Sequence, residues 1–80
     1  MDNNQKYIEA FATALEMAPE DVDASLSFEE SPTWDSVGHI ILVSTLEEQF
    51  GIEFNPDDIF ALKTFDDGKR ILRESYGVEF

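Results

Sequence analysis

The stretch that decides the fold is Trp34-Asp35-Ser36-Val37-Gly38-His39-Ile40-Ile41-Leu42-Val43. Asp35 is a preferred helix N-cap residue, and the apolar residues after it predict a helix that begins at Ser36. The Ser36 hydroxyl is then exposed on a rigid element, among carboxylates and without a base. These surroundings suit a residue that another protein modifies better than a residue that performs catalysis.

This helix is expected to end at about Phe50, because Gly51 can adopt the left-handed conformation of a helix cap. Its apolar residues recur at helical spacing. The face that we expect to be buried consists of Ile40, Leu42, Val43, Leu46 and Phe50.

A second line of residues follows the same helix, off its core face, and consists of Val37, Ile41, Ser44 and Glu48. The line is apolar near Ser36 and acidic further along, so we interpret it as a docking surface for partner proteins. The alternative is that Val37 and Ile41 pack against the preceding loop. Gly38 costs up to about 1 kcal/mol relative to Ala in a helix, and we interpret it as room for another molecule beside Ser36.

Three further helices are predicted around this one. An amphipathic helix is expected over residues 3–17, stopped by Pro19, with Ile8, Phe11, Ala12 and Leu15 facing the core. Asn55-Pro56-Asp57-Asp58 is typical of a capped start for a short helix. Thr64-Phe65-Asp66-Asp67 resembles a capping box and opens a last helix to about Tyr76, which Gly77 ends.

A long loop over residues 20–33 separates the first two helices. Val22, Leu26 and Phe28 are spaced as anchors, and we expect the loop to run along the bundle between two similarly directed helices. The predicted fold is an all-α four-helix bundle, with three longer helices and one short helix, in a single domain over residues 1–80. Its predicted interior contains Phe28, Ile40, Val43, Leu46, Phe50, Ile59, Leu62 and Ile71.

The chain is strongly acidic: it has 18 acidic and five basic residues, and its net charge is −13. Nucleic-acid binding is not expected, since it requires clustered Lys and Arg. An acidic surface favours partners with basic patches, or serves only to keep a small protein in solution. Without a cysteine, a signal segment or an apolar run of about 18 residues, we expect a cytoplasmic protein that does not interact with membranes. We also expect a monomer.

Catalytic residues are scarce, since His39 is the only histidine. Ser36 and His39 are three residues apart and could meet on a helix, but no Gly-rich oxyanion element accompanies them. The paired acids do not follow the pattern of a calcium-binding loop. We therefore expect neither an enzyme nor a dedicated metal site.

Together these features resemble the acyl carrier protein family over nearly the whole chain. The resemblance rests on the long anchored loop, the Asp35-Ser36 pair, Leu46-Glu47-Glu48-Gln49-Phe50-Gly51-Ile52, and the starts of the last two helices. It implies that a phosphopantetheinyl transferase moves 4′-phosphopantetheine from coenzyme A to Ser36. The thiol of this arm would then hold an acyl group as a thioester. It also implies that Asp35 caps the helix and helps the transferase to recognise the site.

The same resemblance implies that Glu47 and Glu48 face basic patches on acyl-loading and acyl-transferring enzymes, and that Trp34 is a hydrophobic anchor. Carriers of primary fatty-acid synthesis commonly have Leu, an acid and a further acid where this chain has Val37, Gly38 and Ile41. Trp-Asp-Ser-x-Gly-His therefore resembles carriers of polyketide or other specialised pathways, while D-alanyl-type carriers also use Asp-Ser-x-Gly. The bulky Phe residues favour a small or polar cargo held at the surface.

Two other classes remain open at this stage. An unmodified adaptor with a carrier-like fold would use Val37, Ile41, Glu47 and Glu48 only to bind proteins. An acidic helical mimic would occupy a nucleic-acid-binding surface and would not depend on Ser36.

Overall fold

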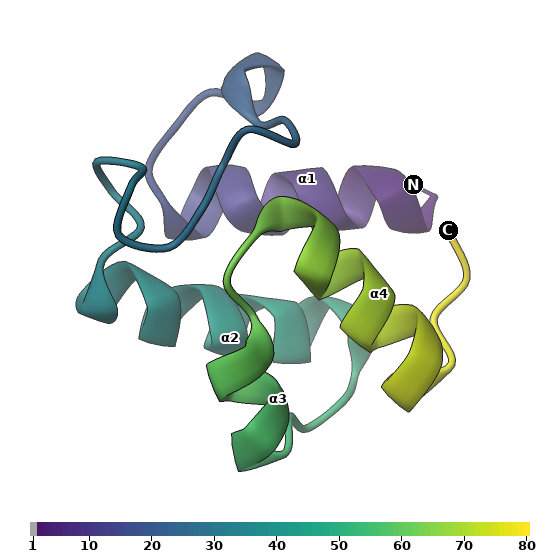
Figure 1. Cartoon of the computed structure of the whole chain (residues 1–80). Helices are drawn as coiled ribbons and strands as arrows, with labels where there is room; N and C mark the ends of the chain where they lie inside the picture. The colour runs from purple at the N-terminus through teal and green to yellow at the C-terminus, as the bar shows by residue number, and fades with distance from the viewer. Residues whose placement is uncertain (1) are drawn as a thin grey trace.

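A computed structural model describes residues 2–80 of the chain (Figure 1). Its helices are α1 (Asn3–Ala14), α2 (Ser36–Phe50), α3 (Pro56–Ala61) and α4 (Phe65–Tyr76), with a 3-10 helix at Pro19–Asp21. The only strand-like pairing among these residues is an isolated antiparallel bridge between Ser27 and Thr64. The prediction of an all-α fold with three longer helices and one short helix is confirmed. None of the helices in this part of the chain combines the length and apolarity needed to cross a bilayer.

The first two long helices run in opposite directions, so the expectation that they are similarly directed is wrong. The end of α1 lies beside the start of α2, since a Cβ on Gly38 would be 3.3 Å from Leu15 Cδ2. Figure 1 shows the long loop returning to this same end of the molecule instead of running along the bundle. The two chain ends also meet, because Asn3 Nδ2 donates to the Glu79 carbonyl at 2.8 Å.

The long loop is held to the core and to the linker between α3 and α4. Val22 and Leu26 are buried, which confirms these two anchors, whereas Phe28 is only half-buried. The Phe28 N–H donates to the Lys63 carbonyl at 2.7 Å, and the Phe65 N–H donates to the Leu26 carbonyl at 3.1 Å. The loop therefore fixes where α4 begins.

The C-terminus of α1 comes earlier than predicted. Glu16 has φ 54, in the left-handed region, and the Met17 N–H donates to the Ala12 carbonyl at 3.0 Å. This is the hydrogen bond of a Schellman motif, which usually has Gly at the left-handed position. Glu16 therefore ends the helix before Pro19 can act.

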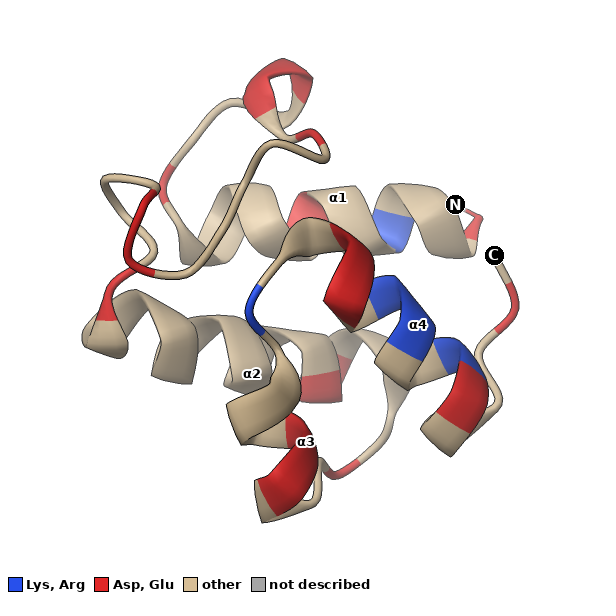
Figure 2. Cartoon of the chain, in the orientation of Figure 1, with Lys and Arg blue, Asp and Glu red and all other residues tan. Residues whose placement is uncertain are grey.

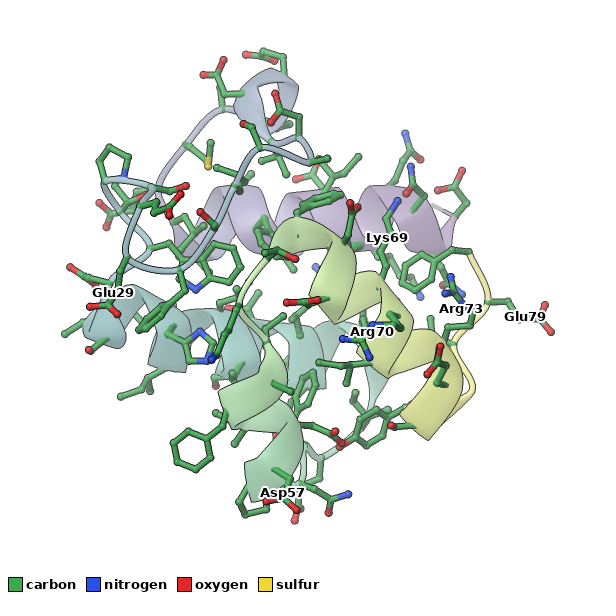
Figure 3. All side chains as sticks on the ribbon, in the orientation of Figure 1. Glu29, Asp57, Lys69, Arg70, Arg73 and Glu79 are labelled. Carbon is green, nitrogen blue, oxygen red and sulfur yellow. The ribbon has the colours of Figure 1, made fainter. Side chains whose placement is uncertain are left out.

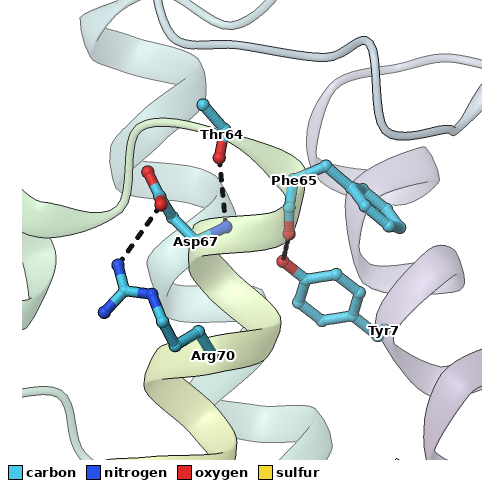
Figure 4. A network of polar contacts seen from close by, with 5 residues as sticks. All are labelled: Tyr7, Thr64, Phe65, Asp67 and Arg70. Atoms are coloured by element: carbon cyan, nitrogen blue, oxygen red, sulfur yellow. Dashed lines mark hydrogen bonds and ion pairs between the residues drawn. The ribbon is translucent and has the colours of Figure 1, made fainter.

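The other helix ends follow most of the predicted signals. Gly51 and Gly77 end α2 and α4 in the left-handed conformation, and Thr64 Oγ1 accepts from the Asp67 N–H at 3.0 Å (Figure 4). The Asp67 carboxylate pairs with Arg70 at 3.2 Å, so the expected capping box is only half formed. Asn55 occupies the N-cap position of α3, but its side chain makes no capping hydrogen bond, contrary to the prediction.

The centre of the core is aromatic. Phe11 packs against Tyr7, Trp34 and Phe65 with ring centroids 4.8–5.4 Å apart. The Tyr7 hydroxyl donates to the Phe65 carbonyl (Figure 4), and a Cβ on Gly68 would lie 2.0 Å from that hydroxyl oxygen. Burial, with the nearby Asp66 and Asp67 charges, raises the pKa of Tyr7 and keeps it a donor. Sequence reasoning did not identify Tyr7 as a core residue.

The predicted interior is correct for Val43, Leu46, Leu62 and Ile71, which are buried. Phe28, Phe50 and Ile59 are half-buried and pack against the edge of the core. Ile40 is 71% exposed, so its assignment to the core face of α2 is wrong. The buried face of α2 includes Gly38 and is rotated away from Ile40. The sequence pattern did not reveal this, because Gly has no apolar side chain.

Candidate functional site

Ser36 is exposed and is the first residue of α2. Asp35 is the N-cap, because its Oδ1 accepts from the Gly38 N–H at 2.8 Å and its carbonyl accepts from the His39 N–H at 2.8 Å. This confirms Asp35 as the cap of the helix. The N–H groups of Ser36 and Val37, in the first turn, have no acceptor within the helix. Together with the positive end of the helix dipole, they would stabilise an anion at this position.

Gly38 is buried against the loop that precedes α2. A Cβ at this residue would lie 2.3 Å from the Thr33 carbonyl oxygen, a backbone atom that a side-chain rotation cannot move. The segment that lies close to Gly38 is thus the preceding loop of the same chain. The interpretation of Gly38 as room for another molecule is therefore wrong. This close packing holds the loop against α2 and fixes the backbone on which Ser36 lies.

His39 connects three segments around the site. The Trp34 indole N–H donates to His39 Nδ1 at 2.9 Å, and His39 Nε2 lies 2.9 Å from the Ile59 carbonyl oxygen. Since Nδ1 is an acceptor here, Nε2 carries the proton and donates to α3. Both ring nitrogens are therefore engaged, and neither is available as a base for Ser36. Trp34 is fully buried, as the anchor role predicts.

A pocket of about 380 Å³ lies between α2 and α3, and we call it the α2–α3 pocket. Its walls include Ser36, His39, Ile40, Ile59, Phe60 and Lys63. Ile40 and Phe60 stand at its rim, 71% and 76% exposed. Lys63 is the one basic residue of its lining, in the linker between α3 and α4. Sequence reasoning missed Phe60 and Lys63, because only the packing of α3 on α2 brings them to Ser36.

A second pocket, of about 240 Å³, lies on the other side of the α2 N-terminus, and we call it the α1–α2 pocket. Val37 and Ile41 line it from α2, facing Glu16 at the end of α1 and Asp35 in the loop. Val37 is 65% exposed and Ile41 is 46% exposed, so packing against the loop does not bury them.

The predicted docking line on α2 is accessible over its length. Ser44 and Glu48 are exposed further along the helix from Val37 and Ile41. Glu47 is half-buried, and its Oε2 accepts from the Phe54 N–H at 2.8 Å. Glu47 thus has a structural role in holding the α2–α3 connection, which the sequence did not indicate.

The charges are unevenly placed. Figure 2 shows acidic residues over the long loop and α3, whereas basic residues gather on α4. Figure 3 labels Lys69, Arg70 and Arg73 on that helix, away from the start of α2. Lys69 donates to Asn4 Oδ1 at 2.7 Å and Arg70 pairs with Asp67. In residues 2–80 no group of three or more acids and histidines is arranged to hold a metal ion.

The arrangement suits a serine that accepts a group from a separate enzyme. The hydroxyl is exposed, the backbone beneath it is fixed by Asp35 and Gly38, and the nearest histidine is occupied. A phosphate bonded to Ser36 Oγ would meet free backbone N–H groups at the helix start. The exposed apolar residues on either side provide surface for a flexible attached group or for a partner.

Comparisons with known proteins agree with this chemistry. A family model described as "Phosphopantetheine attachment site" matches residues 6–67. An acyl carrier protein of Chlamydia trachomatis serovar L2 is 38% identical over 60 residues, covering 75% of this chain and 78% of that protein. An acyl carrier protein of Chlamydia muridarum is similar to the same extent, with the same shares of both chains covered. No solved structure matches the chain significantly.

Proposed function

The chain belongs to the phosphopantetheine attachment-site family and is a non-catalytic carrier, and we propose that Ser36 is the residue that receives the group. The observation that carries this proposal is the placement of an exposed Ser36 at the head of α2, over a backbone fixed by Asp35 and Gly38. Ser44, also exposed on α2, lies two turns further along and lacks the helix N-terminus.

The residues around Ser36 fit the group. When attached, phosphopantetheine supplies the thiol that this cysteine-free chain lacks, and that thiol holds an acyl group as a thioester. Ser36 Oγ forms a bond to the pantetheine-side phosphorus of coenzyme A, and the pyrophosphate bond breaks. The nucleotide bisphosphate leaves, and the hydroxyl proton passes to a base on the transferase, because His39 has no free nitrogen.

The cargo that we propose is an acyl group of fatty-acid-like, polyketide or other specialised biosynthesis. The relatives named acyl carrier proteins support an acyl group over an aminoacyl one. We propose that the transferase and the acyl-transferring enzymes dock on Val37, Ile41, Ser44 and Glu48, with Glu47 at the edge of this surface. The exposed Val37 and Ile41 favour a partner with an apolar contact near Ser36 and a basic group near Glu48.

Intact mass after incubation with coenzyme A and a broad-specificity phosphopantetheinyl transferase tests the proposal. The wild-type chain is expected to gain one phosphopantetheine, and Ser36→Ala is expected to gain none. Ser75→Ala is the matched control, because it removes an exposed serine hydroxyl from α4, outside the proposed docking surface, and should still be modified.

Modification of Ser36→Ala to the wild-type extent would place the group elsewhere. A wild-type chain that no transferase modifies would overturn the carrier function and leave an unmodified adaptor.

A further inference from the structure

The α2–α3 pocket contains a basic residue that the carrier function, as stated so far, does not use. Resting on the proposed attachment at Ser36, we propose that Lys63 binds the phosphodiester formed there and directs the attached arm along the α2–α3 pocket. Lys63 is then a positioning residue for the arm, and the α1–α2 pocket stays open for partners.

The position of Lys63 supports this role. Ser36 and Lys63 lie on the walls of the same pocket of about 380 Å³. The backbone of Lys63 is held in place, because its carbonyl accepts from the Phe28 N–H at 2.7 Å. Its side chain is exposed, and the one ion pair that residues 2–80 form joins Arg70 to Asp67. The flexible ammonium group is thus available to an anion that projects from Ser36 into the pocket.

The charge on the two sides of Ser36 supports the direction. The α1–α2 pocket has Glu16 and Asp35 in its lining and no basic residue, so a phosphodiester that turned that way would meet like charges. The α2–α3 pocket has Lys63 and no acidic residue in its lining. In a chain of net charge −13, this local reversal of sign gives an anion on Ser36 one favoured side.

The apolar rim of the α2–α3 pocket supports the same direction. Ile40 and Phe60 belong to α2 and α3, and both leave most of their side chains exposed. An arm that leaves Ser36 past Lys63 passes between these side chains and covers apolar surface that is otherwise in water. The proposed occupant of the α2–α3 pocket is therefore the arm attached to Ser36, a residue of the pocket's own wall.

The experiment compares Lys63→Gln with Lys6→Gln, each in its unmodified and its phosphopantetheine-loaded form. Lys6→Gln is the matched control, because it removes the same charge from α1, where Lys6 lines a pocket beside the chain ends. The readouts are the difference in Tm between loaded and unmodified protein at low salt, and the phosphorus NMR chemical shift of the phosphodiester.

We expect Lys63→Gln to lose at least half of the wild-type Tm difference and to shift the phosphorus resonance. Lys6→Gln should preserve both, Lys63→Arg should restore both, and added salt should reduce the wild-type difference. Equal Tm differences and equal phosphorus shifts in all of these loaded proteins would overturn the role of Lys63 and leave the carrier function intact. A wild-type chain that gains no mass would overturn both.

Discussion

The N-terminus of α2 separates two pockets that differ in their walls: Ser36 lines the α2–α3 pocket, and its neighbours Asp35 and Val37 line the α1–α2 pocket. The α2–α3 pocket joins two helices, carries Lys63, and is rimmed by Ile40 and Phe60. The α1–α2 pocket lies between α2, the end of α1 and the loop before α2. Glu16 and Asp35 are its acidic lining residues, and Val37 and Ile41 line it from α2. Both expose apolar side chains, so charge is what distinguishes them.

This difference gives one small bundle two kinds of surface beside Ser36. Because the arm is covalently attached to Ser36, a single cation and an apolar pocket are enough to bias its direction. A partner enzyme approaches from solution and needs an accessible surface that the arm does not cover. We infer that the arm uses the α2–α3 side and that partners use the α1–α2 side.

The largest expected effect is on the wall of the α1–α2 pocket, in Gly38→Ala. The new Cβ would lie 2.3 Å from the Thr33 carbonyl oxygen, so the loop must shift. Overpacking of this kind costs about 1–3 kcal/mol, and the better helix propensity of Ala offsets about 1 kcal/mol. Because the clash is with a backbone atom, we take the upper end of this range and expect a net loss of about 2 kcal/mol in the free energy of unfolding, measured by urea titration, together with slower modification of Ser36.

Ser44→Ala is the control for this change, since it also places Ala on α2 but at an exposed residue. Its stability should stay within about 0.5 kcal/mol of wild type. A Gly38→Ala variant that is as stable as this control would show that the close approach of the loop is unimportant.

A somewhat smaller effect is expected at the floor of the α2–α3 pocket, in His39→Ala. The change removes two hydrogen bonds and leaves the buried Trp34 indole N–H without its acceptor. An unsatisfied buried donor costs about 1–3 kcal/mol, so we expect His39→Ala to lose about 1.5 kcal/mol in the free energy of unfolding. Ile40→Ala, one residue further along α2 and exposed, should change stability much less. Equal losses in the two variants would contradict the bridging role of His39.

The division between arm and partner predicts a difference in binding. Ile41→Ala should weaken the affinity of the unmodified chain for its transferase by up to about 1 kcal/mol, or roughly fivefold, because it removes apolar area from the proposed contact. Phe60→Ala removes a still more exposed apolar side chain from the other pocket and should leave that affinity unchanged. Titration calorimetry with both variants checks this. If Phe60→Ala weakens binding as much as Ile41→Ala, partners use both sides.

The smallest expected effect is at Glu16, where α1 ends. Glu16 has φ 54, which is costly for a residue with a side chain, so Glu16→Gly should stabilise the fold by about 0.5–1 kcal/mol. Glu16→Ala removes the same charge but keeps the strained backbone, and should not stabilise. Thermal unfolding of the pair separates the two causes: a matching gain in both variants would trace it to charge instead of conformation.

The parts of the fold that could be predicted are those encoded by neighbouring residues. The bounds of α2 followed from Asp35 and Gly51, and the start of α4 followed from Thr64, because caps act within a few residues. The end of α1 was misplaced because its left-handed residue is Glu16, and that conformation is typical of Gly or Asn.

The parts that could not be predicted depend on how the helices pack. The buried face of α2 was misread because Gly38 contributes no apolar signal, and Ile40 was placed inside in consequence. Ser36 could be singled out from its own surroundings. Lys63 and Phe60 could not, since they reach the site only through the placement of α3, which no local pattern encodes.

The measurement that tests the central claim most directly is a comparison of backbone amide chemical shifts between the unmodified and the phosphopantetheine-loaded chain. Residues next to Ser36 will shift in any case, so the informative positions are those that are distant in sequence. We predict clear shifts at Phe60 and Lys63 and none at Ala14 and Glu16, which line the α1–α2 pocket. Shifts at Ala14 and Glu16, with Phe60 and Lys63 unchanged, would contradict the account, because the arm would then lie on the side assigned to partners.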